Sequence, residues 1–443
     1  MKKKILVLSL LLVSMLQLKA SDAYLTNFSL NTYLKTNTNY DISVTVKNAN
    51  NTPVTNFTLC WQLENGTVYS KVFGVGGGGI TSGNYFPVIH TNQLNIANSG
   101  NYHIKVWICN TMTSDNNQAN DTIHKDVMVL SNYVTKKVLI EEFTATSCQY
   151  CPAGNSVLNT ISNNENAVVA AMHITGNYVT TQTSSYASLT GCSATPQAII
   201  NRGEFGTYNI TSNHVNWSQD VTNRIGISPV GISFTQNYNS TNRLLTINTK
   251  VNFKEAFSGE YLVNIYVLES RIIGYQAGAS SNYTHNHVVR KLLGGTEGFS
   301  NFIPLQPTAN MDYTRQDTIT IPTAWNTANL EIVAYIYQKN QNNLRNVLNV
   351  SKYCFNTTGL EEMGNNSLIK HYPNPVNEQL TLEFNNFTNN KVQVFSLDGK
   401  LVIDQEYQNV NFCIIPMSNL NSGIYIIQIT NEESTKSFKI TKL

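Results

Sequence analysis

Apolar and polar residues alternate repeatedly in the first third of the chain. Apolar side chains recur at every second position over residues 42–46, 57–63 and 102–108, which places them on one face of a β-strand. Asn65-Gly66 follows the second of these runs and is a typical hairpin turn. Short alternating strands joined by turns predict a β-sandwich over residues 21–133.

The pattern changes between residues 134 and 227. Three short apolar runs predict buried strands, and helical spacing of apolar residues follows Pro152 and surrounds Val221. The runs are Val138–Ile140, Val168–Met172 and Ala198–Ile200. The resulting order of strand, helix, strand, strand and helix predicts an α/β domain.

Alternation returns after this region and predicts a second β-sandwich over residues 228–355. Residues 356–367 are polar, contain two glycines and predict a linker. Short strands then predict a small β domain over residues 368–443. The chain is therefore expected to be a multi-domain, mainly β protein.

The first twenty residues have the features of a secretory signal peptide. Three lysines, at positions 2 to 4, precede an apolar run over residues 5–16, and Ala20 is a suitable cleavage position. The apolar run is shorter than the roughly 20 residues that a membrane-spanning helix requires. No later stretch is longer and equally apolar. We therefore expect an exported mature protein that begins near Ser21 and has no transmembrane span.

Composition excludes some classes of protein. Hydrophobic residues make up 41% of the chain, which does not suggest disorder. The formal net charge is +2, and removal of the signal peptide with its four lysines leaves the mature chain slightly acidic. Such a balance does not indicate a nucleic-acid-binding protein.

The chain contains seven cysteines, so at least one lacks a disulfide partner within the full chain. Disulfides persist in exported proteins. Cys60 and Cys109 lie in two predicted strands of the first sandwich. They could form a disulfide or remain two buried thiols.

The strongest chemical signal is Cys148-Gln-Tyr-Cys151-Pro, between a predicted strand and a predicted helix. The N-terminus of a helix stabilises a thiolate on the first cysteine of such a pair. The thiolate attacks substrate disulfides. Cys148 is therefore predicted as the nucleophile and Cys151 as the cysteine that resolves the mixed disulfide.

Two other residues could complete this site. Glu142 lies six positions before Cys148 and could move protons for Cys151. Pro196 could form a cis peptide bond beside the cysteines, because cis bonds are accessible mainly before proline. Two alternatives remain open: a purely structural disulfide, or half of a zinc site, although no second pair with the required spacing follows.

Weaker signals accompany the pair. His285 and His287 would face one side of a strand and could bind a metal, but no third ligand is evident, and a polar strand end is the plainer interpretation. Cys192 lies four residues before Pro196 and could be a third redox cysteine or a free buried thiol. The sequence indicates no cofactor and no metal.

The segment from Ile140 to Pro152 resembles the active-site segment of thioredoxin-fold proteins and, more narrowly, the Omp28-related outer-membrane proteins. Two further stretches also resemble that family, namely Pro196-Gln-Ala-Ile-Ile-Asn-Arg202 and Tyr283–Arg290. The resemblance covers about residues 134–355 and implies a thioredoxin-like α/β domain and a redox site. Ser147 departs from thioredoxins, which usually carry Trp before the first cysteine. Residues 21–133 more generally resemble immunoglobulin-like adhesion modules.

Residues 368–443 resemble the type A C-terminal sorting domain of type IX secretion. Tyr372-Pro-Asn-Pro, the Asp398-Gly399 turn, the Gly423-Ile-Tyr strand and a basic end occur in order. This resemblance implies that type IX secretion machinery is a partner and that the protein reaches the outer-membrane surface or the exterior.

Two functions follow from the sequence. The protein could be a thiol–disulfide oxidoreductase-like factor that acts on envelope or external proteins with disulfides. Alternatively, it could be a non-catalytic surface protein for binding or adhesion, in which Cys148 and Cys151 form a structural disulfide. Whether the protein is an enzyme is left open by the sequence.

Overall fold

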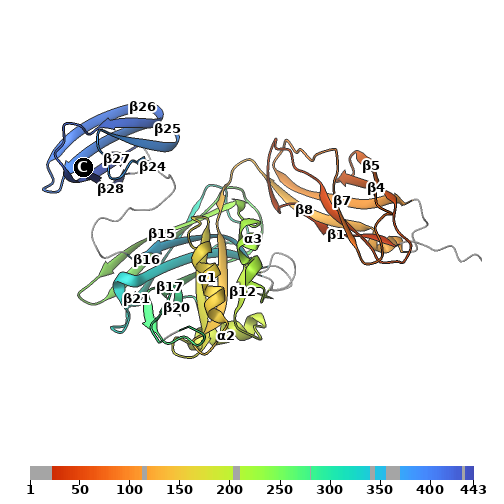
Figure 1. The fold of residues 1–443 in the computed structure, drawn as a ribbon, viewed down its shortest axis with the longest axis horizontal. Coiled ribbons are helices and arrows are strands. Elements are labelled where there is room, and N and C mark those ends of the chain that lie inside the picture. The colour runs from red at the N-terminus through yellow and green to blue at the C-terminus, as the bar shows by residue number, and fades with distance from the viewer. Residues whose placement is uncertain are drawn as a thin grey trace, which may run out of the picture.

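The computed structural model describes residues 22–111, 117–202, 210–279, 281–339, 345–355, 370–431 and 435–443. Figure 1 shows an N-terminal β body, a central body that contains the α-helices of the described residues, and a C-terminal β body. The expected signal peptide, residues 1–20, and the expected linker, residues 356–367, lie outside the described residues.

Two sheets form the N-terminal body, with orders β1-β3-β6 and β2-β8-β7-β4-β5. In β3, Val44 and Val46 are buried while their neighbours are partly exposed, as the alternation predicts. A disulfide joins Cys60 in β4 to Cys109 in the adjacent strand β7. The strands are β1 (Ala23–Phe28), β2 (Tyr33–Lys35), β3 (Ser43–Asn48), β4 (Asn56–Leu63), β5 (Val68–Gly74), β6 (Tyr85–Ile89), β7 (Gly100–Thr111) and β8 (Thr122–Leu130), with a 3₁₀ turn at Gln118–Asn120.

The central body begins with an α/β part built around β10, which is buried along its whole length. β10 pairs in parallel with β11 and antiparallel with β12. The elements of this part are β9 (Val134–Lys136), β10 (Val138–Ala145), α1 (Cys151–Ile161), β11 (Ala167–Thr175), α2 (Thr181–Thr190), β12 (Gln197–Ile200), β13 (Ile210–Thr211), a 3₁₀ turn (His214–Asn216), α3 (Trp217–Thr222) and β14 (Gly226–Ser228).

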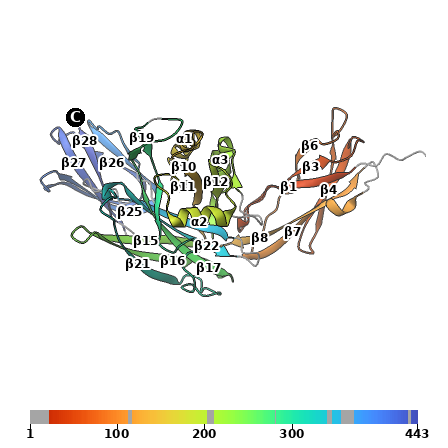
Figure 2. The ribbon, with the colours of Figure 1, turned by 90° about the horizontal axis from the view of Figure 1, so that it is seen from below.

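Helices cover both faces of this part of the sheet. Leu158 of α1 and Trp217 of α3 pack with Ile140 on one face, and Tyr186 of α2 packs with Leu139 on the other. Figure 2 shows α1 and α3 side by side. Because consecutive residues of a strand point to opposite faces, Glu142 lies on the face of α1 and Glu141 on the face of α2.

The structure differs from the expected division of the central region into two domains at residue 228. Four later strands, β17, β20, β22 and β23, continue the same sheet in the order β13-β12-β10-β11-β20-β17-β22-β23. The join is made where Ala171 of β11 pairs with Val288 of β20. Periodicity within a strand carries no information about such a non-local neighbour, so the sequence suggested a separate sandwich.

A second, three-stranded sheet of order β15-β16-β21 packs over the later strands. Its Leu245 and Ile247 share a core with Ile265 of β17 and Ile332 of β22. The strands are β15 (Val230–Asn239), β16 (Leu244–Phe253), β17 (Glu260–Glu269), β18 (Ile272–Gly274), β19 (Tyr283–His285), β20 (Val288–Leu292), β21 (Asp312–Thr320), β22 (Leu330–Lys339) and β23 (Arg345–Cys354), with a 3₁₀ turn at Thr327–Asn329.

The C-terminal body is a small β domain with its own core, in which Leu382, Val394, Ile415 and Ile427 are fully buried. Its long strand β25 pairs with β24, β26 and β27, and β27 pairs with β28. The strands are β24 (Lys370–Tyr372), β25 (Gln379–Ser396), β26 (Leu401–Pro416), β27 (Gly423–Thr430) and β28 (Thr435–Lys442). The expected multi-domain, mainly β fold is confirmed. Among the described residues, no helix combines the length and the apolar character needed to cross a membrane.

Candidate functional site

Cys148 and Cys151 lie at the N-terminus of α1 and form a disulfide, with their Cα atoms 5.5 Å apart. Cys148 is half-buried, whereas Cys151 is 0% exposed. α1 begins at Cys151 with Pro152 in its first turn, a position that proline favours because it lacks an amide hydrogen. The N-cap residue, Tyr150, makes no side-chain capping bond, so it does not occupy the first amide groups of the helix.

The loop before β12 lies against the same cysteines. The peptide bond between Thr195 and Pro196 is cis, and the Sγ atom of Cys148 lies 3.5 Å from the Thr195 carbonyl oxygen. A Cβ atom on Gly154 of α1 would lie 3.2 Å from the Cβ atom of Pro196. The proline therefore packs closely on the first turns of α1.

Glu142 lies beneath α1 and is 0% exposed. Within the described residues, neither of its carboxylate oxygens has a hydrogen-bond partner. A Cβ atom on Gly154 would be only 2.9 Å from Glu142 Oε1, and Gly154 shares a helix face with Cys151, three residues earlier. Burial raises the pKa of Glu142 well above its usual value, because desolvation favours the protonated form.

His285 and His287 have different partners in the structure. His285 is buried, with its ring against His173 and Tyr178, and burial lowers its pKa. The Nδ1 atom of His287 lies 2.9 Å from Glu331 Oε2. Among the described residues, no group of three or more histidine, cysteine or acidic side chains has a geometry that could hold a metal ion.

Cys192 belongs to the loop that carries Pro196. It is half-buried, its Sγ atom lies 3.3 Å from the Ala194 carbonyl oxygen, and burial raises its pKa. Its side chain packs against the core beneath α2. Cys354 is exposed and Cys413 is buried in the C-terminal domain, and both are free thiols.

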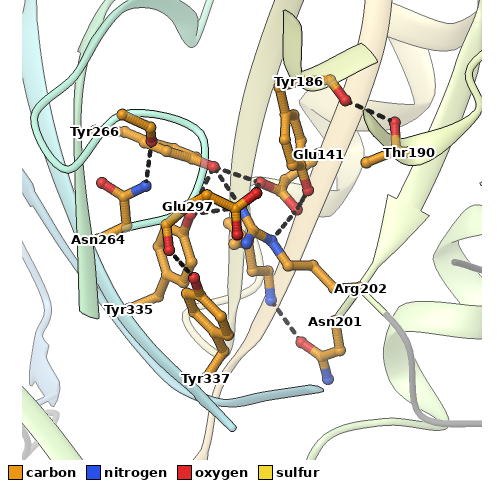
Figure 3. Close-up of polar contacts among 12 residues, drawn as sticks. Glu141, Tyr186, Thr190, Asn201, Arg202, Asn264, Tyr266, Glu297, Tyr335 and Tyr337 are labelled. Atoms are coloured by element: carbon orange, nitrogen blue, oxygen red, sulfur yellow. Dashed lines mark hydrogen bonds and ion pairs between the residues drawn. The ribbon is translucent and has the colours of Figure 1, made fainter. Parts of the chain in front are cut away.

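The sequence reasoning did not find a buried polar cluster on the opposite face of β10 (Figure 3). Arg202 donates from Nε to Glu141 Oε2 at 3.0 Å and from Nη2 to Glu141 Oε1 at 3.1 Å. The hydroxyl groups of Tyr186 and Tyr266 also donate to Glu141, at 2.9 Å and 2.7 Å. Tyr335 accepts from Arg202 Nη2 at 2.5 Å. We call these five residues the Arg202 cluster.

Desolvation and neighbouring charges act in opposite directions on the pKa of Arg202. Burial lowers the pKa of Arg202, but the carboxylate of Glu141 and the surrounding tyrosines raise it well above the usual value. The cluster ties β10, α2, β17 and β22 to the end of β12. Arg202 was noticed in the sequence as part of a family-like stretch, but nothing there identified Glu141 as its partner.

Comparison with known proteins gives two family matches. Residues 183–359 match the family described as outer membrane protein Omp28, and residues 370–442 match the secretion system C-terminal sorting domain. The resemblance to Omp28-related proteins with a sorting domain is thereby confirmed. Both matches indicate a cell-surface or outer-membrane protein. The Omp28 match includes Pro196 and Arg202 but begins after Cys148 and Cys151.

Individual relatives are more distant. The ulvan lyase NLR42 of Nonlabens ulvanivorans is 28% identical over 170 residues, which are 36% of this chain and 32% of that protein. The chain thus spans about a third of the length of this curated relative. HBP35 of Porphyromonas gingivalis has a TM-score of 0.43 at 18% identity, with 69% of this chain and 98% of that chain covered. A domain of the outer membrane lipoprotein Omp28 from the same organism has a TM-score of 0.21 at 20% identity, with 29% and 89% covered.

Proposed function

We propose that this protein exchanges disulfides with thiols of envelope or external proteins through Cys148 and Cys151. The observation that carries the proposal is the unequal exposure of the two cysteines at a helix N-terminus. Cys148 is partly exposed, whereas Cys151 is fully buried on the helix face whose Gly154 packs on Glu142. A disulfide that serves only as a staple does not require such an arrangement.

The exchange starts from the disulfide form. A substrate thiolate attacks Cys148 Sγ, the Cys148–Cys151 bond breaks, and Cys151 leaves with the bonding electron pair and takes a proton from Glu142. A second substrate thiolate then attacks the substrate sulfur of the mixed disulfide and releases Cys148 as a thiolate. The substrate becomes a disulfide, and the protein holds two reduced cysteines. The reverse sequence reduces a substrate disulfide.

The electrostatic environment of the pair favours attack of the substrate thiolate on Cys148, with Cys151 as the leaving group. The released Cys148 thiolate lies at the N-terminus of α1, where the helix dipole stabilises negative charge. A buried carboxyl group with a raised pKa is a suitable proton donor to the leaving sulfur of Cys151. Roles for Cys148, Cys151, Glu142 and Pro196 in catalysis are part of this proposal.

A thioredoxin-like architecture is also part of the proposal. It is supported by the cysteine pair between β10 and α1, the parallel pairing of β10 with β11, and the proline loop before the antiparallel strand β12. Ser147 in place of the usual Trp changes the surface next to Cys148. The preferred partners are therefore expected to differ from those of ordinary thioredoxins.

The sorting domain supports delivery by type IX secretion machinery, as a partner of residues 370–442. A second candidate function is a non-catalytic surface protein for binding or adhesion. It is favoured by the separate N-terminal sandwich and by the Omp28 match, which does not include the two cysteines. In that case the Cys148–Cys151 disulfide has only a structural role.

A trapping experiment separates the two candidates. Mature Cys151→Ser protein should accumulate mixed disulfides with envelope proteins through Cys148, because the resolving thiol is missing. Cys148→Ser should accumulate far fewer, because Cys151 is buried. Cys192→Ser is the matched control and should leave trapping by Cys151→Ser unchanged. Equal trapping by all variants, or none by Cys151→Ser, would favour the non-catalytic surface protein.

A further inference from the structure

The loop between β18 and β19 lies against the segment that carries Cys148. The amide nitrogen of Ala277 donates to the Thr146 carbonyl oxygen at 2.8 Å. Gly278 has φ +78°, and a Cβ atom there would lie 2.1 Å from the Gln149 carbonyl oxygen. This close approach requires glycine, both for the left-handed backbone and for the absence of a side chain.

The side chain of Gln276 in this loop contacts the turn that precedes Cys148. Its side-chain nitrogen donates to the carbonyl oxygen of Ala145 at 3.1 Å and to that of Cys148 at 2.7 Å. The Ala145 oxygen also accepts from the Cys148 amide nitrogen at 3.1 Å. Gln276 is only 1% exposed. One amide group therefore bridges both ends of the turn between β10 and Cys148.

The loop itself is held by the later strands of the central body. The Nε2 atom of His285 in β19 lies 3.3 Å from the Tyr275 carbonyl oxygen. A Cβ atom on Gly274 in β18 would lie 2.2 Å from the Tyr178 hydroxyl group, so the start of the loop also packs closely. The position of Gln276 is thus fixed by contacts with β19 and with the segment between β11 and α2.

We propose that Gln276 is a positioning residue that holds the Cys148 turn in the geometry in which Cys148 and Cys151 form their disulfide. Two carbonyl oxygens converge on one buried amide group. Without them the turn gains freedom in the reduced state, and closing the disulfide costs more entropy. The consequence for exchange with partners rests on the function proposed above, but the consequence for the equilibrium of the pair does not.

The test is the equilibrium constant for disulfide formation in the mature protein, measured by titration with glutathione and dithiothreitol buffers. Gln276→Met keeps the length of the side chain and removes both hydrogen bonds. We expect the constant to fall about fivefold, since a typical net hydrogen bond contributes about that factor, and the reduction potential to rise by about 20 mV. Gly278→Ala should shift the constant in the same direction, because its Cβ atom displaces the loop from Gln149.

Gln182→Met is the matched control. The amide group of Gln182 exchanges two hydrogen bonds with Leu292, at 2.9 Å and 3.1 Å, and so also joins a helix to the later strands. It should leave the constant unchanged. An unchanged constant in folded Gln276→Met and Gly278→Ala, or an equal fall in Gln182→Met, would overturn the positioning role. Failure of Cys151→Ser to trap partners, with the shift present, would overturn only the proposed exchange with partners.

Discussion

Replacing Arg202 tests whether its cluster holds the central body together. In Arg202→Met, Glu141 loses the bidentate ion pair with Arg202 and keeps its hydrogen bonds from the hydroxyl groups of Tyr186 and Tyr266. Both charged side chains are 0% exposed, so water does not compensate. Breaking a buried pair on one side costs about 3–5 kcal/mol. For a body of this size we expect the melting temperature to fall by roughly 6–20 °C.

Calorimetry of the mature protein measures this change, with the transition of the N-terminal sandwich as internal reference, because the Arg202 cluster lies outside it. Lys250→Met is the matched control: Lys250 pairs with Asp312 at 3.2 Å with both side chains about half exposed. Its removal should cost less than about 1 kcal/mol.

The double variant Glu141→Leu/Arg202→Met provides the sharper test. It removes both buried charges, so it should be more stable than Arg202→Met alone. The reasoning about the cluster would be wrong if the stability costs of Glu141→Leu and Arg202→Met simply added in the double variant. It would also be wrong if Arg202→Met melted within a few degrees of the unchanged protein.

Three further predictions concern other parts of the chain. Burial raises the pKa of Glu142, so the contribution of its protonated form to stability is complete below the unfolded pKa of about 4.3 and is lost as pH rises through the folded pKa. The urea midpoint of the protein should therefore decline from acidic to alkaline pH, and Glu142→Gln should flatten this decline. Parallel pH profiles of the two proteins would contradict the prediction. Loss of the Cys60–Cys109 disulfide, whose cysteines are 49 residues apart, should cost the N-terminal sandwich about 4 kcal/mol in urea unfolding, and a change below about 1 kcal/mol would contradict it. Deletion of residues 368–443 should leave a folded protein in the periplasm, as shown by cell fractionation; normal surface delivery would refute the sorting role.

Strands with one face toward a core could be predicted from the sequence. β3 buries every second residue, which produces the alternation that the sequence displays. β17 and β22 are buried along almost their whole length, because both faces of the long sheet are covered. Alternating apolar residues located these two strands in the sequence. They could not reveal that the strands continue the sheet of β10 and β11.

The candidate site shows the same limit. The spacing of Cys148 and Cys151 before Pro152 indicated a helix N-terminus, which is where the structure has them. The loop that carries Gln276 lies more than one hundred residues later in the chain, and no local pattern connects it to Cys148. Glu141 and Glu142 are adjacent in sequence, yet one contacts Arg202 and the other lies beneath α1, since neighbouring strand residues face opposite sides.

The reduction potential of the Cys148–Cys151 pair in the mature protein tests the central claim most directly. It is obtained by equilibrating the protein with defined redox buffers and quantifying the free thiols of Cys148 by alkylation. Disulfide exchange with partners predicts a potential within roughly −120 to −270 mV, the range of proteins that exchange disulfides. A potential below about −300 mV, with no exchange at Cys148, would contradict the account and identify the pair as a structural staple.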